Sequence, residues 1–269
     1  MTSTQPQPTA GLATRWLASY PKSGNTWVRF LIYHYFRGEA RSSGEIARLI
    51  PGFHNPAQMR AAEPFDGSLF VKTHFPLGLD VPHHDRARGC VYVVRHPRDV
   101  ILSCLNYARL TGGISDAAND FDRMYVHSFL SRGGAPEYFT RRFGSLDDHY
   151  RSWLDQTRFP VHMVRYEDLK AAPVRELARI VEFLGHAPEP ARVESAVALS
   201  SFERLKTMEI DEKTSGASNA LFAGSAEQMK KGRLFMNRGE SGRSLEPIAP
   251  GLDRAADERF ADMIRRFGY

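Results

Sequence analysis

The segment Tyr20-Pro-Lys-Ser-Gly-Asn-Thr-Trp27 brings a lysine, two hydroxyl groups and a glycine into one short turn. A short apolar run that begins at Trp16 precedes it, and apolar side chains at helical spacing follow over Val28–Phe36. The pattern predicts a strand, a tight loop and a helix. Because the first turn of a helix presents unpaired N–H groups and the positive end of the helix dipole, this loop suits phosphate or another oxyanion.

The lysine of this turn stands in the wrong place for a nucleoside triphosphatase. Lys22 precedes Gly24, and the signature Gly-x-x-x-x-Gly-Lys-Ser/Thr is absent. This argues against ordinary hydrolysis of ATP or GTP. Short Lys-Ser-Gly segments also occur in solvated turns, so the segment by itself leaves both interpretations open.

Two further apolar runs end in residues that can do chemistry. Leu69-Phe-Val-Lys-Thr-His74 ends in a histidine, whose neutral imidazole, with a pKa near ~6.5, suits a general base. Cys90-Val-Tyr-Val-Val-Arg95 ends in an arginine, whose planar fork suits phosphate, and Ser103 lies in the predicted helix beyond it. Taken singly, each of these residues is also compatible with a structural role.

The order of elements predicts a single-domain α/β fold. A fourth apolar run at Val161–Tyr166 and a helix at Pro173–Leu184 continue the alternation of strands with helices, which favours a parallel sheet with helices on both faces. Ligands bind such sheets at the carboxyl ends of the strands, where Lys22, His74 and Arg95 all lie.

The outer segments are less regular. Residues 1–14, rich in Ser, Thr, Gln and Pro, are expected to be a disordered tail before a domain that spans 15–269. Residues 207–234 lose their periodicity, which indicates a mobile flap. One closing helix is predicted from about Asp253 to Phe267.

Composition excludes several classes of protein. Hydrophobic residues make up 42% and charged residues 25%, as in an ordinary globular protein, and the net charge of +5 comes without the Lys/Arg block typical of nucleic-acid binding. Cys90 and Cys104 are expected to be buried, reduced thiols rather than a disulfide or a zinc site. With no signal peptide and no apolar run long enough to span a membrane, a cytoplasmic protein is expected.

Taken together and in this order, the motifs resemble those of sulfotransferases that use 3′-phosphoadenosine 5′-phosphosulfate (PAPS). Tyr20–Trp27 resembles their 5′-phosphosulfate loop, Lys72-Thr73-His74 the element that holds their catalytic base, and Arg95-His-Pro-Arg-Asp99 with Ser103 their 3′-phosphate element. The resemblance implies the P-loop-like sulfotransferase fold, PAPS as donor, no metal, and transfer of a sulfuryl group to a hydroxyl. The chain is more similar to bacterial small-molecule enzymes than to membrane-anchored Golgi enzymes.

Three later segments extend the resemblance. They are Val164–Lys170, Ser200–Lys206 and Phe235–Gly242. The last departs from the family pattern, because Asn237 replaces a basic residue and Arg243-Ser-Leu replaces Asp-Trp-Lys. The family's dimerisation pattern near the C-terminus is also absent, so the oligomeric state stays open.

The resemblance implies roles for individual residues. His74 is the implied general base, Lys22 neutralises the leaving 5′-phosphate, and Lys72 stabilises the sulfuryl oxygens. The implied cofactor-binding residues are Lys22, Ser23, Gly24, Asn25, Thr26, Trp27, Arg95, Ser103, Tyr166, Ser200, Phe202, Asn237, Arg238 and Gly239.

Two other functions stay open at this point, a P-loop-type small-molecule or nucleoside kinase and a non-catalytic nucleotide-binding regulator. The acceptor, a phenol, an alcohol or a natural product, is expected to contact the variable loops 33–60, 107–147 and 207–234. Six aromatic residues either line its pocket or belong to the local core: Phe75, Tyr107, Phe121, Tyr125, Phe129 and Phe139.

Overall fold

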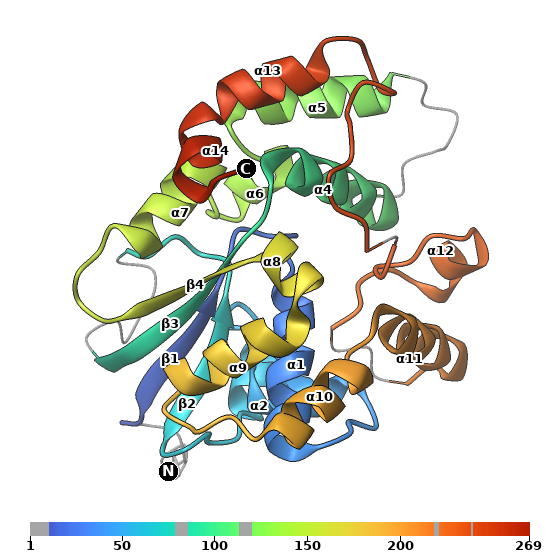
Figure 1. Ribbon diagram of the computed structural model, residues 1–269. Coiled ribbons are helices and arrows are strands. Elements are labelled where there is room, and N and C mark those ends of the chain that lie inside the picture. The colour runs from blue at the N-terminus through green and yellow to red at the C-terminus, as the bar shows by residue number, and fades with distance from the viewer. Residues whose placement is uncertain (1–10, 79–85, 113–119, 218–220, 238) are drawn as a thin grey trace, which may run out of the picture.

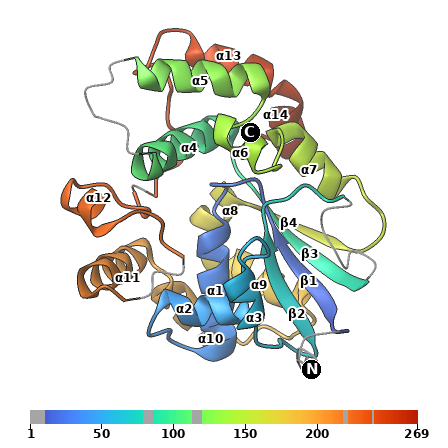
Figure 2. The same cartoon turned by 180° about the vertical axis from the view of Figure 1, so that it is seen from behind.

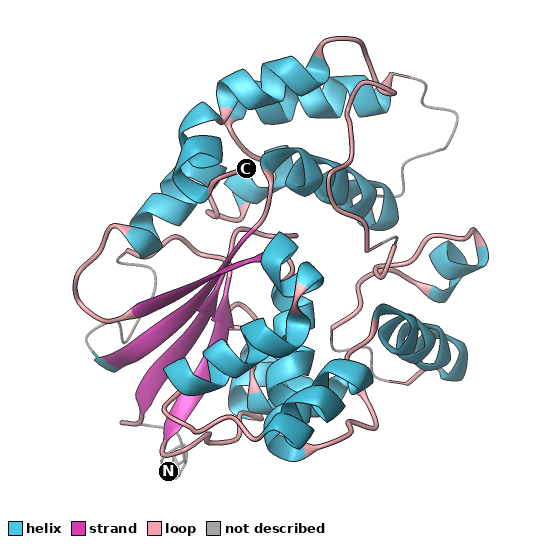
Figure 3. Ribbon diagram, viewed as in Figure 1, coloured by secondary structure: helices cyan, strands magenta, loops and turns pink. Residues whose placement is uncertain are grey.

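The fold is built on a four-stranded parallel sheet. The computed structural model describes residues 11–78, 86–112, 120–217, 221–237 and 239–269. The strands are β1 (Ala13–Ala18), β2 (Ser68–Thr73), β3 (Ala87–Val94) and β4 (Val161–Arg165), in the order β2-β1-β3-β4 (Figures 1 and 3). The prediction of a parallel α/β sheet is confirmed.

The register brings the carboxyl ends of the three strands that carry chemistry to one edge of the sheet. Ala18 at the end of β1 pairs with Thr73 on β2 and with Tyr92 on β3. The loops that leave β1, β2 and β3 therefore start side by side. Lys22, His74 and Arg95 lie on these loops, within a few residues of the strand ends.

Side chains that alternate along the strands form two separate cores, one on each face of the sheet. Trp16, Cys90 and Tyr92 belong to one core, whereas Leu17 and Val91 belong to the other. Both cores are closed by amphipathic helices, as expected for strands buried on both faces.

The helices fall into three groups (Figures 1 and 2). The helices that pack on the Leu17 face are α1 (Asn25–Arg37), α2 (Ser43–Leu49), α8 (Tyr166–Ala171), α9 (Pro173–Phe183) and α10 (Pro190–Leu199). Those of the Trp16 face are α4 (Pro97–Thr111), α5 (Phe121–Arg132), α6 (Pro136–Thr140), α7 (Leu146–Leu154), α13 (Leu252–Arg259) and α14 (Ala261–Phe267). The remaining helices are α3 (Pro56–Arg60), α11 (Phe202–Ser215) and α12 (Ala226–Lys230).

Local signals explain where several helices begin. Proline occupies the first turn of α4, α9 and α10, where its missing N–H and fixed φ are favourable. The predicted helix from Pro173 is α9, and Gly185 follows it with a φ of 91°. Such a positive φ favours glycine and ends the helix.

Three boundary predictions need correction. Strand β1 begins at Ala13, inside the stretch 1–14 that was expected to be a tail, while residues 1–10 lie outside the described part. The single helix expected over 253–267 is instead two helices, α13 and α14, interrupted at Phe260. The expected flap 207–234 begins with helical residues, because α11 extends to Ser215.

A buried ion pair explains why α11 is longer than its polar sequence indicates. Glu209 and Lys213 stand one turn apart, both are buried, and they form a salt bridge. The Lys213 ammonium also donates to the carbonyl of Ala223, and the Glu209 carboxylate accepts from the backbone N–H groups of Phe235 and Met236, each at 2.7 Å. These partners satisfy the two buried charges and anchor the helix within the stretch that was expected to be a flap.

Two further predictions concern thiols and membrane spans. Cys90 and Cys104 are free and buried, as expected. Across the described ranges, no helix combines the length and the apolarity that crossing a bilayer requires.

Candidate active site

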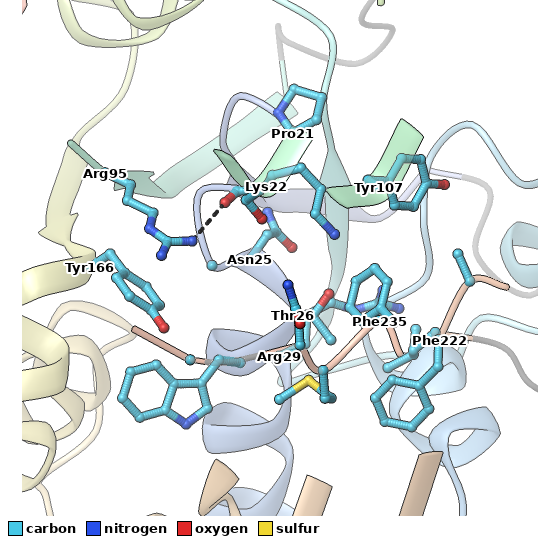
Figure 4. A pocket seen from close by; sticks show the side chains of 18 of the residues that line it. Pro21, Lys22, Asn25, Thr26, Arg29, Arg95, Tyr107, Tyr166, Phe222 and Phe235 are labelled. Carbon is cyan, nitrogen blue, oxygen red and sulfur yellow. Dashed lines mark hydrogen bonds between the residues drawn. The ribbon is translucent and has the colours of Figure 1, made fainter. Parts of the chain in front are cut away.

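A cavity of about 630 Å³ opens at the carboxyl ends of β1, β2 and β3. Its wall combines the start of α1, the ends of β2 and β3, part of α4, and the segment that follows α12. Figure 4 shows Lys22 in this cavity, with Arg95 and Tyr166 on one side of it and Tyr107, Phe222 and Phe235 on the other.

The loop between β1 and α1 has the backbone geometry of an anion site. Lys22 and Gly24 have φ angles of 70° and 106°, and no side chain caps the first turn of α1, which begins at Asn25. A Cβ at Gly24 would lie 2.5 Å from Cδ2 of Tyr166, so only glycine fits there without displacing the ring. The uncapped N–H groups of α1 are therefore available to an oxyanion.

Asn25 ties the loop to the strand before it. Its side-chain amide donates to the carbonyl of Leu17 at 3.4 Å and to the hydroxyl of Ser19 at 3.2 Å. Its Oδ1 is buried and has no hydrogen-bond partner among the described residues. The side chain thus supports the loop, and its expected contact with the ligand stays a prediction.

Lys22 is a half-buried cation whose ammonium lies against aromatic rings. Its ammonium lies 3.7 Å from the ring centre of Phe235 and 4.6 Å from that of Tyr107, and no carboxylate within the described chain forms a salt bridge with it. Burial lowers the pKa of Lys22 to about 8. A phosphate would supply the missing negative charge.

Arg95 lies between the loop that joins β1 to α1 and the segment after α12. It donates to the carbonyls of Lys22 at 3.3 Å and Glu240 at 2.7 Å, and its guanidinium lies 4.3 Å from the ring centre of Tyr166. Its Nε is buried without a partner in the structure as described. A site with an unpaired donor on a cation is suited to an anion.

Asp99 fastens the segment that passes over Arg95, a contact that sequence reasoning missed. Its carboxylate accepts from the backbone N–H of Gly242 at 2.8 Å and of Arg243 at 3.2 Å. The available signal was an acidic residue buried in the first turn of α4, directly after the Arg95-His-Pro motif.

His74 is held in one tautomer. Its Nδ1 lies 2.8 Å from the carbonyl oxygen of Ser19, which can only accept, so Nδ1 carries the proton and Nε2 is free to take one. Burial, and then the positive charge of Lys72, hold the pKa of His74 well below its usual 6.5. The imidazole is therefore neutral at neutral pH.

The backbone of His74 is held by a second histidine that the sequence did not single out. The Nε2–H of His149, on α7, donates to the carbonyl of His74 at 3.0 Å. The hydroxyl of Tyr92, on β3, then donates to Nδ1 of His149 at 2.7 Å. Burial lowers the pKa of His149 to about 3, so it stays neutral and keeps these two roles. A buried polar chain thus links three elements to the predicted base.

Lys72 lies at the end of β2 with a 7% exposed side chain. Its N–H donates to the carbonyl of Pro51 at 2.8 Å, and its carbonyl accepts from Phe53 at 2.7 Å, which orders the start of the 51–55 loop. Burial lowers the pKa of Lys72, and the charges of Arg29 and Lys22 lower it further. The three cations therefore form one cluster.

Most of the predicted nucleotide contacts line this cavity together. The lining residues that were predicted are Lys22, Gly24, Asn25, Thr26, Trp27, Lys72, His74, Arg95, Ser103, Tyr166, Phe202, Asn237 and Gly239. Gly239 has a φ of 63°, and a Cβ there would lie 2.7 Å from Cδ2 of Phe202, so glycine permits this close packing.

Two predicted contacts are not among the lining residues. Ser23 is fully buried, and the hydroxyl of Ser200 bonds Nδ1 of His34 at 2.8 Å, while its carbonyl accepts from the indole of Trp27. Ser201, the next residue, lines the cavity in its place. Arg238 lies outside the described residues.

The acceptor end was the least predictable part. Of the six aromatic candidates only Tyr107 lines the cavity; Tyr125 and Phe129 are buried in the core, and Phe75 packs on Phe143 at 5.1 Å. Residues that the sequence analysis did not name also line it, and all but Arg29 belong to the predicted loops 33–60, 107–147 and 207–234: Arg29, His54, Asn55, Gln58, Tyr138, Arg141, Phe143, Leu221 and Phe222.

This fold and this cavity define a class of protein that binds a phosphorylated ligand at the first loop of an α/β sheet and holds a neutral histidine beside it. The family model of the sulfotransferase domain matches residues 13–268. The chain therefore belongs to the family of PAPS-dependent sulfotransferases.

Individual relatives are distant. The chain is 28% identical to rat Sulfotransferase 1A1 over 201 residues, which are 71% of this chain and 66% of that protein. It is 26% identical to flavonol 3-sulfotransferase of Flaveria bidentis over 90% of this chain and 80% of that one. The chain thus spans about two thirds or somewhat more of the length of these relatives.

Solved structures of low identity share the fold. Mouse sulfotransferase SULT7A1 complexed with PAP has a TM-score of 0.65 at 21% identity, covering 94% of this chain and 85% of that chain. Retinol dehydratase in complex with androsterone and inactive cofactor PAP has a TM-score of 0.63 at 20% identity, and the match covers 93% of this chain and 80% of that chain. The expected P-loop-like sulfotransferase fold is confirmed.

Proposed function

We propose that the protein transfers the sulfuryl group of PAPS to a hydroxyl group of a small-molecule acceptor. The observation that carries this proposal is the position of His74, neutral and with Nε2 free, in the same cavity as the lysines Lys22 and Lys72. PAPS, when bound, supplies the sulfuryl group and a phosphate leaving group. The names of the relatives support a small acceptor, since one is a flavonol sulfotransferase and two neighbouring structures hold androsterone or retinol.

The cavity has the donors that such a nucleotide needs. The uncapped start of α1 and Lys22 are suited to the 5′-phosphosulfate, and Arg95 and Ser103 to the 3′-phosphate. The unpaired Nε of Arg95 supports this assignment, because an anion would satisfy it. Trp27 and Tyr166 line the cavity and pack edge-to-face on each other, with centres 5.8 Å apart and planes inclined by 66°, and we assign this aromatic surface to the adenine.

In the proposed reaction His74 acts as general base. Its Nε2 accepts the proton of the acceptor hydroxyl, while Ser19 keeps the proton on Nδ1 and so preserves the tautomer. Lys22 and Lys72 stabilise the negative charge of the phosphosulfate. Neither lysine needs a metal ion for this role. Among the described residues, no three or more His, Cys, Asp or Glu side chains are grouped so that they could hold a metal ion.

Calorimetry with 3′-phosphoadenosine 5′-phosphate (PAP) and AMP tests the nucleotide assignment. PAP should bind about 10–100 times more tightly than AMP, because charge-assisted contacts to the 3′-phosphate are worth about 1.5–3 kcal/mol. Equal affinities would contradict it. Appearance of the sulfated product from PAPS and 4-nitrophenol, without ATP or Mg²⁺, would separate this function from the kinase alternative, which the relatives do not favour.

Two finer assignments belong to the same proposal. We place the enzyme in the cytoplasm, which its two free cysteines support, since reduced thiols are typical of that compartment. Bacterial origin stays a prediction from the sequence resemblance alone, and the relatives named above come from a mammal and a plant.

A further inference from the structure

Arg29 is a buried cation without an acidic partner. It lies on α1, its side chain lines the active-site cavity, and the residue is 4% exposed. Its Nη2 donates to the carbonyl of Ile50, while its Nε has no partner and no described carboxylate forms a salt bridge with it. Burial lowers the pKa of Arg29 to about 9, which still leaves the guanidinium charged at neutral pH.

Further positive groups surround the same end of the cavity. Lys72, Arg29, Arg141 and His54 all line the cavity; burial, and then the positive charges of Lys72, Arg29 and Arg141, lower the pKa of His54 to about 3. The ring of His54 is stacked on that of His74, with centres 6.1 Å apart and planes inclined by 21°. The cationic groups are therefore gathered around the proposed base.

The two carboxylates that line the cavity have partners at its other end. Asp99 accepts from the N–H groups of Gly242 and Arg243, and the Glu240 carboxylate forms a salt bridge with Arg243 at 3.4 Å. The described acceptor end thus holds positive charge without negative charge. Lys22 and Lys72 are matched by the phosphosulfate, but Arg29 and Arg141 are not.

An unpaired buried cation destabilises the folded protein unless a ligand brings the counter-charge. Arg29 is specific in this respect, because its planar fork matches a carboxylate with two parallel hydrogen bonds. Phe143 and Tyr138 add aromatic surface to the same cavity, on the side of His74: the Phe143 ring centre lies 5.8 Å from that of His74 and 5.7 Å from that of Tyr138.

On the basis of the function proposed above, we propose that the acceptor itself is an anion: a hydroxylated aromatic or similarly apolar molecule whose carboxylate is bound by Arg29, with Arg141 at the mouth of the cavity. His74 takes the hydroxyl proton. The acceptor oxygen then forms its bond to sulfur as the bond from sulfur to the 5′-phosphate oxygen breaks, and the electron pair of that bond leaves with PAP. The product carries both the original carboxylate and the new sulfate.

A pair of acceptors that differ only in charge provides the test. These are 3-(4-hydroxyphenyl)propanoate and its methyl ester, each assayed with PAPS. The ratio of kcat/KM, acid over ester, should exceed 1 by about 10–100-fold, the size of one charge-assisted contact. Arg29→Gln should reduce that ratio by about tenfold or more, and Arg29→Lys should restore part of it.

Two matched variants complete the design. Arg141→Gln should lower the acid-to-ester ratio by a smaller factor than Arg29→Gln, because Arg141 is exposed. For the same reason this variant should fold like the native protein. Arg60→Gln removes an exposed arginine of α3 that does not line the cavity, so the ratio should stay as in the native protein. PAP affinity, measured for every variant, identifies those that fail to fold. If Arg29→Gln is one of them, the acid-to-ester ratio of Arg141→Gln decides the question.

Binding without turnover gives an independent readout. Calorimetry with the PAP-loaded protein should show tighter binding of the acid than of the ester, and Arg29→Gln should remove the difference. An acid-to-ester ratio near or below 1, or one that neither arginine variant changes, would overturn the inference while PAP binding and ester sulfation leave the proposed function intact. An equal loss with both acceptors in Arg29→Gln would also overturn it, since Arg29 would then serve the donor. If PAP binds no better than AMP, the proposed function itself fails.

Discussion

The Nδ1 atom of His74 lies 2.8 Å from the carbonyl oxygen of Ser19, so the end of β2 is linked directly to the loop that follows β1. The bond has a chemical consequence, because a carbonyl cannot donate and the imidazole proton must sit on Nδ1. Nε2 is therefore the only basic nitrogen of His74. The loop suited to phosphate thus also sets the tautomer of the proposed base.

Replacing His74 by Asn should reduce turnover by about 10²–10⁴-fold, the usual contribution of a general base. The phosphate contacts of Lys22 and Arg95 remain, so the affinity for PAP should barely change. Steady-state kinetics with PAPS and calorimetry with PAP measure the two quantities. Near-native turnover of the variant would refute the role of His74, and parallel losses of stability and PAP affinity would indicate a structural role.

Replacing His149 by Leu should lower kcat through the position of His74. The variant leaves the His74 carbonyl without the His149 donor and the Tyr92 hydroxyl proton without the His149 acceptor, and an unsatisfied buried group costs about 1–3 kcal/mol of stability. His149→Gln can still donate to that carbonyl and should recover part of kcat. Thermal unfolding measured beside kcat separates the effects: equal kcat in the Leu and Gln variants at different stability would leave His149 with a purely structural role.

The pH dependence should show two limbs with different origins. His74 must be neutral to act, and its pKa is lowered, so activity should rise with pH only below 6.5 and be level through neutral pH. Lys22 must be charged, and its pKa is about 8 in the protein without ligand, so kcat/KM for PAPS should decline above about pH 8.

Two comparisons test this assignment. Bound phosphate raises the pKa of Lys22 by stabilising the ammonium, so the alkaline limb of kcat should lie higher than that of kcat/KM. Lys22→Arg carries a charge that does not titrate in this range and should flatten the alkaline limb of kcat/KM. A rise of activity through pH 6.5–7.5 would contradict the lowered pKa of His74.

Hydrogen exchange should divide the segment 207–234 at the end of α11. The helix is anchored by the buried pair of Glu209 and Lys213, so its amides should be protected even without ligand. Residues 221–237 include the ring of Phe235 that covers Lys22, and they should gain protection when PAP binds. Uniform exchange across both parts, unchanged by PAP, would show that no part of this segment responds to the nucleotide.

Glu209→Gln tests the anchor itself. The variant leaves Lys213 without a counter-charge. Breaking a buried ion pair in this way typically lowers the free energy of unfolding by about 3–5 kcal/mol. The backbone N–H groups of Phe235 and Met236 donate to the Glu209 carboxylate, so faster exchange at these two amides would show that the loss of stability arises at this anchor. Asp211→Asn, an exposed change on the same helix, serves as the control and should leave both amides unaffected.

The sequence by itself determined the sheet and the nucleotide end of the site. Each of these three strands is a short apolar run followed within a few residues by its functional residue, so Lys22, His74 and Arg95 could be assigned to one edge from local pattern alone. The spacing of these residues within continuous motifs is what made the family recognisable. Such signals are local because the loop, the helix start and the strand end each act within a few residues of chain.

Only the tertiary structure decided what surrounds that edge. Arg29, His54 and Phe143 lie far apart in the sequence and have no shared pattern, yet packing brings them to one wall of the cavity. Burial also sets the charge states: it lowers the pKa values of His74 and Lys22, which composition cannot reveal. Desolvation and counter-charge depend on neighbours from distant elements, and for that reason the acceptor end had to be seen in three dimensions.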